Sequence, residues 1–472
     1  MKPFADKKRC SPLAGALARL GLNPIRRLAV LAAVAVIVSS TFALAQAGSL
    51  DPTFGTGGIF TTNYTQYDAA MDTAVAIQSD GKIVLGGTVP NSQGQAAALL
   101  RLNTNGTLDS SFGTGGIVTS DFGITDGAFV YAITIQPNGQ IVAAAGGGIL
   151  SEGSVGRFNT DGSVDTTFGS GGFAVSESLF SQEGFLNNAL ALQADGKILV
   201  TSAGLIGRYT SSGQLDTTFG NAGIAPLSGA SATAIALQSD GKILVTTGTG
   251  APTALPTEQN LPGQQAGTIT RYNTDGSLDT NFGVSGQSAC VASAAAMAIQ
   301  SNGKIVVAGT IPSALLTTTS GGRIVINNQT GFGVVRYNSN GSVDTTFNPG
   351  GGIGSGGGII TGFGSSFPAG SAFALAIQSN GEIVVAGQAG VGNQHFTSSS
   401  FVLARYTTNG LLDTSFGNNG TVITTLSQAP ISFVSALVLQ SDGKIVAAGN
   451  TSSDVGEGFV LDNFAVARYL AQ

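Results

Sequence analysis

The sequence contains few of the side chains that most enzymes use for catalysis. Its 472 residues include no tryptophan, two cysteines and a single histidine, and only 10% are charged. A Ser-His-Asp or Cys-His centre would need His395, which lies in the segment 393–396 without an evident partner in the sequence. One histidine and two cysteines also fall short of a typical zinc site. We therefore interpret His395 as a loop residue.

The first 47 residues have the composition of an export signal. Seven basic residues precede an apolar run over 28–38, and small residues follow at 43–47 as Ala-Leu-Ala and Ala-Gln-Ala. This order is typical of a cleaved secretory signal, cut after Ala45 or after Ala47. An apolar run of about 11 residues is too short to span a bilayer. Arg26 and Arg27 leave the twin-arginine route open beside the general one. We expect a mature domain over 48–472 in the periplasm, outside the cell or on its surface.

Without this leader the chain is acidic. It keeps 20 − 7 = 13 basic and 26 − 1 = 25 acidic residues, a net charge near −12. Such a charge disfavours nucleic acid and anionic membrane surfaces as partners. Cys10 leaves with the leader and Cys290 stays alone, so no internal disulfide is expected. The composition predicts a soluble monomer that binds neither nucleic acid nor membrane.

Two short phrases recur seven times along the mature chain. The first begins at Gln78 as Gln-Ser-Asp-Gly-Lys, and its glutamine returns at 136, 193, 238, 300, 378 and 440. The second begins at Arg101 as Arg-Leu-Asn-Thr-Asn-Gly-Thr-Leu-Asp, and its arginine returns at 157, 208, 271, 336, 405 and 468. Both phrases place a glycine, mostly after Asn or Asp, between alternating apolar runs. This is typical of tight hairpins, because glycine takes positive φ without steric cost.

Each repeat predicts four antiparallel strands. They are a run ending at the glutamine, a run after the first turn, a run ending near the arginine, and a short run through Asp to Phe. Seven such units favour an all-β, seven-bladed β-propeller over an open β-solenoid. The last repeat stops at Leu470 before its fourth strand, and the segment 49–55 supplies a spare one. Pairing these two would complete blade seven and remove both free edges.

The repeats resemble a known family. The phrases Leu-Asp-x-x-Phe-Gly-x-x-Gly and Gln-Ser-Asp-Gly-Lys are similar to the delta-60 repeats of bacterial exported proteins, over nearly all of the mature chain. The four-strand layout is similar to NHL-type propeller repeats. The resemblance implies a propeller in a secreted or cell-surface setting, and it carries over no catalytic residue.

Arginine and aspartate of the second phrase are eight residues apart in all six uninterrupted repeats. A three-residue turn with a left-handed glycine would place them opposite each other, where the guanidinium could hold the carboxylate through two hydrogen bonds. Twelve of the 13 mature basic residues occupy repeat positions, and Arg323 is the exception. We therefore predict structural ion pairs, rather than a ring of arginines for a ligand. The pairs are Arg101–Asp109, Arg157–Asp165, Arg208–Asp216, Arg271–Asp279, Arg336–Asp344, Arg405–Asp413 and Arg468–Asp51.

Two cofactor or enzyme alternatives stay open. Residues 159–165 offer oxygen ligands at alternate positions, like a fragment of a calcium loop, but the same residues suit a hairpin turn. We expect no cofactor, with calcium as the alternative. A propeller hydrolase or lactonase could use a metal held by carboxylates in the central channel, although no spacing of acidic residues selects a pair. The absence of tryptophan argues against a quinone-dependent dehydrogenase.

The connections between the constant turns vary in length. The spacing from glutamine to arginine is 23, 21, 15, 33, 36, 27 and 28 residues. Antiparallel strands put the two constant turns on one face of the ring and the variable connections on the other. Recognition usually resides in variable loops on a rigid scaffold. The longest are 249–267, 310–331 and 348–370, with Arg323 and His395 among the candidate ligand-face residues. The sequence thus predicts a non-catalytic module for binding a protein or glycan there, or a surface scaffold.

Overall fold

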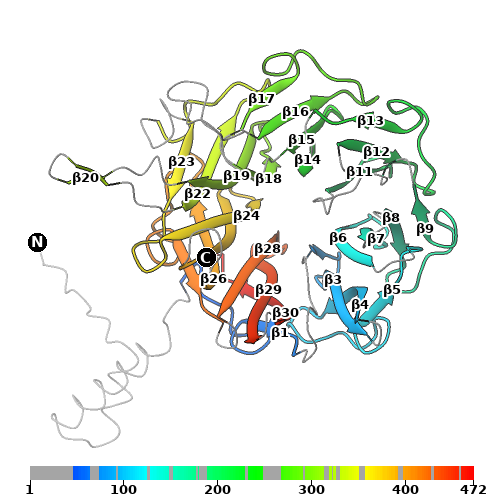
Figure 1. The fold of residues 1–472 in the computed structure, drawn as a ribbon, viewed down its shortest axis with the longest axis horizontal. Helices are drawn as coiled ribbons and strands as arrows, with labels where there is room; N and C mark the ends of the chain where they lie inside the picture. The colour runs from blue at the N-terminus through cyan, green and yellow to red at the C-terminus, as the bar shows by residue number, and fades with distance from the viewer. Residues whose placement is uncertain are drawn as a thin grey trace, which may run out of the picture. The chain divides into compact units, whose positions relative to one another are not determined.

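Seven four-stranded antiparallel sheets form the blades of a β-propeller (Figure 1). The computed structural model describes residues 46–63, 74–91, 94–124, 128–147, 153–176, 179, 189–202, 204–228, 232–247, 267–290, 293–312, 318–320, 323–325, 330–349, 357–391, 397–426, 430–456 and 459–471. The predicted seven-bladed, all-β fold is confirmed.

Each blade runs from an inner strand near the ring axis to an outer strand. Blade one contains β2 (Ala74–Ile77), β3 (Ile83–Asn91), β4 (Gly94–Leu102) and β5 (Ile117–Ser120), and blade two contains β6 (Ala128–Ile135), β7 (Ile141–Gly147), β8 (Gly153–Phe158) and β9 (Phe173–Val175). Blade three contains β10 (Leu190–Leu192), β11 (Ile198–Ser202), β12 (Leu205–Tyr209) and β13 (Ile224–Pro226), and blade four contains β14 (Ala232–Leu237), β15 (Ile243–Thr247), β16 (Thr268–Tyr272) and β17 (Gln287–Ala289).

The remaining three blades follow the same order. Blade five contains β18 (Ser293–Ile299), β19 (Ile305–Pro312), β22 (Thr330–Tyr337) and β23 (Gly358–Thr361), with a separate hairpin of β20 (Thr318–Ser320) and β21 (Arg323–Val325) between β19 and β22. Blade six contains β24 (Ala369–Ile377), β25 (Ile383–Val391), β26 (Ser398–Tyr406) and β27 (Thr421–Thr424). Blade seven contains β28 (Ile431–Leu439), β29 (Ile445–Gly456), β30 (Phe459–Tyr469) and β1 (Ile59–Thr61).

The N-terminal strand completes the last blade, as predicted. Strand β1 pairs antiparallel with β30, with Ile59 opposite Ala467 (Figure 1). The strand lies later than the expected segment 49–55, in which Leu50 makes only a single bridge to Tyr469. Blade seven is therefore built from both ends of the propeller sequence.

In the other blades the fourth strand also begins later in the sequence than predicted. The expected fourth strand from Asp to Phe is therefore wrong. In blade one that run is a turn, in which the Phe112 amide donates to the Asp109 carbonyl at 3.0 Å. Gly113 and Gly116 have φ of 52° and 98°, which turn the chain again before β5 begins. The Phe-Gly-x-x-Gly phrase is thus a second reversal, and the fourth strand follows it. For this reason the expected loop 348–370 contains a strand, β23.

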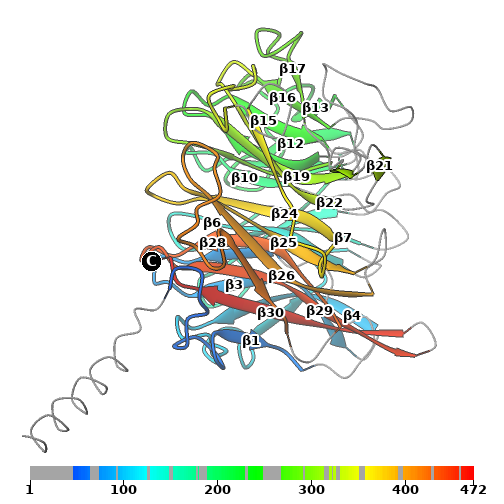
Figure 2. The same ribbon diagram turned by 90° about the vertical axis from the view of Figure 1, so that its left-hand side faces the viewer.

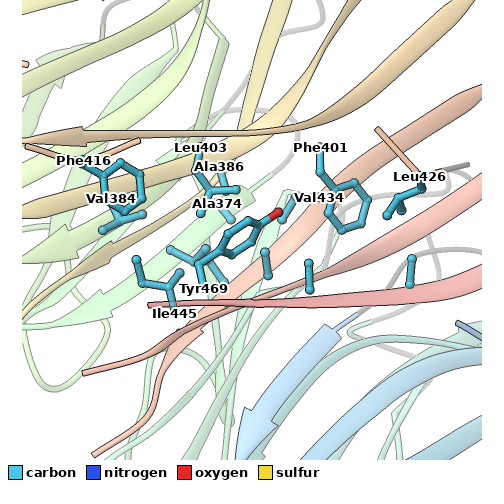
Figure 3. Close-up of a cluster of buried hydrophobic side chains, with 14 residues drawn as sticks. Ala374, Val384, Ala386, Phe401, Leu403, Phe416, Leu426, Val434, Ile445 and Tyr469 are labelled. Carbon is cyan, nitrogen blue, oxygen red and sulfur yellow. The ribbon is translucent and has the colours of Figure 1, made fainter. Parts of the chain in front are cut away.

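Hydrophobic side chains fill the seven interfaces between neighbouring blades. In β3, Ile83 and Leu85 point toward blade seven while Val84 points toward blade two, as the period of two in a strand requires. Both faces of a blade are therefore buried. Figure 3 shows the interface of blades six and seven, where Phe416 and Val384 of one blade lie beside Ile445 and Tyr469 of the other.

Candidate functional site

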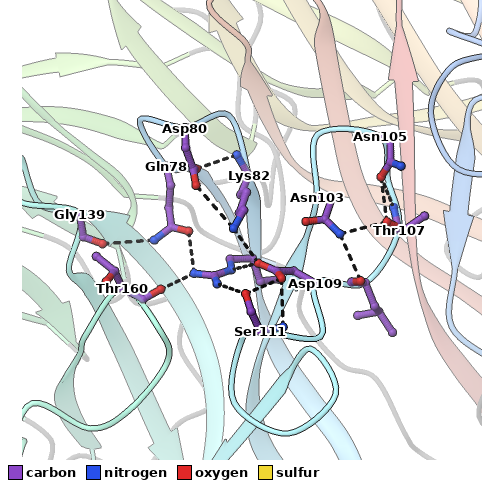
Figure 4. A network of polar contacts seen from close by, with 12 residues as sticks. Gln78, Asp80, Lys82, Asn103, Asn105, Thr107, Asp109, Ser111, Gly139 and Thr160 are labelled. Carbon is purple, nitrogen blue, oxygen red and sulfur yellow. Dashed lines mark hydrogen bonds and ion pairs between the residues drawn. The ribbon is translucent and has the colours of Figure 1, made fainter.

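The repeated charged residues gather where the two constant turns of a blade meet (Figure 4). In blade one, Asn103 and Thr107 close a three-residue turn, and Gly106 within it has φ of 82°. The bridge between Leu102 and Leu108 then sets Arg101 opposite Asp109. Only 6% of the Arg101 side chain is exposed, and its Nε donates to Asp109 Oδ2 at 2.7 Å.

The other groups of the Arg101 side chain are also occupied. Nη2 donates to Ser111 Oγ at 3.3 Å, and Nη1 donates to Gln78 Oε1 at 3.3 Å and to the carbonyl of Thr160 in blade two (Figure 4). The guanidinium carbon lies 4.5 Å from the centre of the Phe112 ring, a cation–π distance. Arg101 thus has partners for Nε, Nη1 and Nη2 and an aromatic ring against its face.

The two carboxylate oxygens of Asp109 make different contacts. Asp109 Oδ1 accepts the backbone N–H of Ser111 at 3.1 Å and the Ser111 hydroxyl at 2.6 Å. Oδ2 faces Arg101 and the ammonium of Lys82, 3.0 Å away. The expected two-bond contact between guanidinium and carboxylate is therefore replaced by a contact to one oxygen, because the turn takes the other.

The structure places all seven predicted partners beside each other. The Nε atom of each arginine lies 2.6–2.9 Å from Oδ2 of its aspartate. The pair Arg468–Asp51 joins the two ends of the propeller sequence with the same geometry as the six local pairs. Each arginine also lies over a phenylalanine, at 4.5–4.8 Å from the ring centre.

The arginines also connect the blades into a closed ring. In every blade, Nη1 donates to a backbone carbonyl in the turn of the next blade, and Arg468 of blade seven reaches Thr104 of blade one. The six other acceptors are Thr160, Ser211, Thr274, Ser339, Thr408 and Ala471. Seven backbone hydrogen bonds between the same turns accompany them, such as Gly113 N–H to the Asp161 carbonyl at 3.0 Å.

These contacts set the ionisation of the aspartates. Burial alone would raise the pKa of Asp165, but the hydrogen bonds from Thr167 and the nearby Arg157 outweigh it and lower the pKa to about 2. The pKa of Asp51 is also lowered to about 2, because hydrogen bonds from Thr53 and the charge of Arg468 outweigh its burial. These carboxylates are ionised at neutral pH and matched by arginine.

Two blades depart from the pattern at the lysine position. Five aspartates have a lysine ammonium 2.5–3.4 Å from Oδ2. Blade two has Gln140 there, which donates to Asp165 at 2.7 Å. Blade six has Glu382, whose Oε2 lies 3.2 Å from Nε of Arg405. Two carboxylates therefore share one arginine in blade six, a feature that the sequence analysis did not single out.

Within the part of the chain that the structure describes, the inner strands carry no ionisable group of the kind that a channel metal would need. The described inner strands β2, β6, β10, β14, β18, β24 and β28 contain no Asp, Glu, Lys, Arg or His. Among the described residues, no group of three or more His, Cys, Asp or Glu side chains could hold a metal ion. No helix within the same residues is long and apolar enough to cross a membrane.

One open groove lies between blades one and two. Its volume is about 750 Å³, and both apolar side chains and hydroxyl groups line it, among the latter those of Ser111 and Ser163. Its carboxylate is Asp161, whose Oδ1 accepts the N–H and hydroxyl of Ser163 at 2.9 and 2.7 Å. Those hydrogen bonds lower the pKa of Asp161. The carboxylate thus holds its own turn, the role that the hairpin interpretation of residues 159–165 assigns to it.

The two candidate ligand-face residues are placed only in part. Arg323 begins β21 and pairs with Ser320 of β20, in the connection between β19 and β22. His395 lies outside the described residues, as do most of the loop 249–267 and half of the loop 310–331. The constant turns are thus described in all seven blades, and the longest variable connections only in part.

Comparison with known proteins agrees with this architecture. Seven segments match a family described as a β-propeller domain of unknown function (DUF5122), at residues 78–112, 136–168, 193–219, 261–282, 320–347, 378–416 and 440–471. The match supports a β-propeller repeat family for this chain. No curated protein sequence matches it.

Several solved structures are similar at low identity. They include the extracellular domain of a candidate one component system from B. thetaiotaomicron (14% identity over 86% of this chain and 40% of that one, TM-score 0.38). A Trichoderma reesei carbohydrate-active enzyme of family AA12 covers 89% of this chain and 98% of its own, at 12% identity and a TM-score of 0.36. Drosophila Plexin A, in complex with Semaphorin 1b, covers 90% and 87% at 11% identity and 0.42. The chain spans about two fifths of the length of the first of these. Such similarity assigns neither ligand nor activity.

Proposed function

We propose that this chain is an exported, non-catalytic β-propeller that binds a protein or glycan through its variable connections, or presents a scaffold at the cell surface. One observation carries the proposal: the charged groups of the repeat satisfy one another. Each arginine has an aspartate, a hydroxyl or amide group and a carbonyl of the next blade as partners. The constant-turn face is therefore occupied with holding the ring together, which leaves recognition to the opposite face.

The sequence supports the exported setting. The leader over 1–47 has the order of a cleaved signal, and its loss leaves an acidic chain. We propose that the repeats are of the delta-60 type and that the mature protein is a soluble monomer in the periplasm, outside the cell or on its surface. Nucleic acid and membrane lipids are disfavoured as partners by the net charge.

Strand lengths support the face with the variable connections as the binding surface. At the variable-connection end, β29 and β30 extend over 12 and 11 residues, against five residues in each of β11 and β12 (Figure 2). The described strands of these hairpins are thus longer in blades five to seven than in blades three and four. A rim of unequal height around a rigid ring is a surface on which a large ligand can be held by several loops.

A binding screen of the mature protein tests the proposal. Glycan arrays and calorimetry with divalent metals are compared for the wild type and for a variant with loop 310–331 shortened. The expected result is binding of a glycan or protein that disappears in the variant, while the melting temperature stays within a few degrees. Metal-dependent turnover of esters or lactones, or calcium binding at the Asp-Gly turns, would overturn it.

A further inference from the structure

The turn that closes blade seven is split between the two ends of the propeller sequence. In blade one the turn runs without a break from Arg101 to Asp109, eight residues on. In blade seven its first half is 468–471 and its second half is 48–51. Gly48 has φ of 85°, matching the 82° of Gly106. The position occupied by Asn105 in blade one, directly before the glycine, is occupied in blade seven by Ala47.

The hydrogen bonds confirm this correspondence residue by residue. In six contacts between blades, the amide that follows the recurring phenylalanine donates to the carbonyl directly before the turn glycine of the next blade, as Gly55 does to Asn105 at 2.7 Å. In the seventh contact, the Gly417 amide of blade six donates to the Ala47 carbonyl at 2.8 Å. Ala47 therefore supplies one of the seven acceptors of the ring.

Neighbouring contacts fix the chain on both sides of Ala47. The Gly48 amide donates to the Leu470 carbonyl at 2.8 Å, and the Leu470 amide donates to the Ser49 carbonyl at 2.9 Å. The Ala47 side chain packs against the hydrophobic cluster between blades six and seven. A Cβ on Gly48 would lie 2.8 Å from Val422 Cγ2, so the chain is held closely against blade six.

We propose that the leader is removed by cleavage between Ala45 and Gln46, so that the mature protein keeps Ala47 as part of the split turn. The proposal rests on the proposed export and selects one of the two small-residue sites that the sequence offers. Water adds across the peptide bond, which leaves a carboxylate on Ala45 and a free amine on Gln46. Cleavage after Ala47 would instead remove the carbonyl that Gly417 uses.

The position of the cut is read by mass spectrometry of the protein recovered from outside the cytoplasm. The expected N-terminal peptide begins at Gln46, including any form in which this glutamine has cyclised with loss of ammonia. A peptide beginning at Gly48 would overturn the inference and leave the proposed function standing. A chain that keeps its leader inside the cell would overturn both. A failed ligand screen with a Gln46 terminus would count against the binding function alone.

Two leader variants separate the sites. Ala47→Asn blocks the second site, because signal cleavage requires a small residue there. Asparagine suits the turn, since it already occupies this position in blades one, five and six as Asn105, Asn340 and Asn409. We expect this variant to be cut at Gln46 as efficiently as the wild type. Ala43→Leu blocks the first site alone, and we expect at least a tenfold loss of cleaved product. Normal processing of Ala43→Leu, or loss of processing in Ala47→Asn, would contradict the assignment.

The melting temperatures of the two possible cleavage products show how much Ala47 contributes to the stability of the split turn. Chains beginning at Gln46 and at Gly48 are prepared by removing a protease-cleavable tag. We expect the shorter chain to melt about 1–2 °C lower, since it lacks one backbone acceptor. Equal melting temperatures would remove the structural reason for the first site.

Discussion

At the scale of single residues, the aspartate of each repeat connects two structures that the chain must form. One oxygen closes the local turn, as Asp216 Oδ1 does with the N–H and hydroxyl of Thr218 at 3.1 and 2.7 Å. The other faces Arg208 at 2.8 Å and Lys197 at 3.2 Å. The arginine in turn donates to Thr274 in the next blade. A single carboxylate therefore influences both its own hairpin and the interface.

Replacing this carboxylate should be costly. Asp216→Ala leaves the buried Arg208 guanidinium without a counter-charge, while Lys197 keeps the exposed carboxylate of Asp195 at 3.4 Å. We expect a loss of about 3 kcal/mol of unfolding free energy. Chemical denaturation and thermal melting measure it. Asp240→Ala is the control, because Asp240 is exposed and accepts only the Lys242 amide. Equal stability of the two variants would show that the ion pair contributes nothing.

The lowered pKa values predict how stability depends on pH. Asp165 and Asp51 have folded-state pKa values of about 2, below the usual value near 3.9 in an unfolded chain. Their stabilisation is therefore fully present above about pH 4 and is lost as the pH falls toward 2. We expect a constant melting temperature from pH 7 to 5 and a steep fall between 4 and 2.

Asp165→Asn provides the matched control for this pH profile. It should melt lower than the wild type at pH 7 and show a shallower fall between pH 4 and 2, because one of the titrating groups is gone. A wild-type melting temperature that rises on acidification below pH 4 would contradict the predicted sign.

A substitution at Glu382 should raise stability rather than lower it. It is 23% exposed and shares Arg405 with Asp413, whereas blade five has Lys304 at the same position. Glu382→Lys should raise stability by about 0.5–1 kcal/mol, the scale of a partly exposed ion pair. Lys304→Glu should lower it by a similar amount. Shifts of both melting temperatures in the same direction would contradict this expectation.

At the scale of the strand and turn, glycine spacing determines where each strand begins. Gly162 has φ of 89°, and a Cβ there would lie 2.6 Å from Val118 Cγ2 and 2.8 Å from Phe112 Cε2 in blade one. Gly171 has φ of 63°, with open space around its Cβ position. Blade three has Ala222 at the corresponding place, with φ of 52°. Positive φ alone is thus tolerated in this turn.

These two glycines predict two different costs. Gly162→Ala should destabilise the protein by about 3 kcal/mol, since backbone strain adds to a clash with the preceding blade. Gly171→Ala should cost about 1 kcal/mol, from backbone strain alone. Denaturant unfolding of both variants measures the difference. Similar costs would mean that the close approach of Gly162 to Phe112 is not important for packing.

The local chemistry of strands and turns also explains which sequence predictions succeeded. The hairpins at Gly81 and Gly106 follow from local chemistry, because a turn glycine between apolar runs has few alternatives. The fourth strand was misplaced because the carboxylate hydrogen bonds that make Asp109 to Phe112 a turn do not appear in a residue pattern. The inter-blade carbonyl acceptors, such as that of Thr160, belong to the backbone and leave no trace in side-chain identity.

At the scale of the whole molecule, the two ends of the propeller sequence meet inside blade seven. There, β1 pairs with β30, Arg468 pairs with Asp51, and the Arg468 guanidinium covers Phe54 at 4.7 Å. The seven interfaces between blades are of one kind, so this pairing inside blade seven determines whether the repeats form a ring or an open array. An open array would expose two sheet edges.

Equilibrium unfolding of the chain with and without residues 46–61 tests this closure most directly. We expect the chain beginning at residue 62 to melt at a lower temperature and over a broader range. We also expect a synthetic peptide of residues 46–61 to bind it and to restore much of the loss. The same peptide with Asp51→Ala should restore less, because Arg468 would lack its partner. A shortened chain that melts at the temperature of the full propeller, with no response to the peptide, would contradict the closed ring.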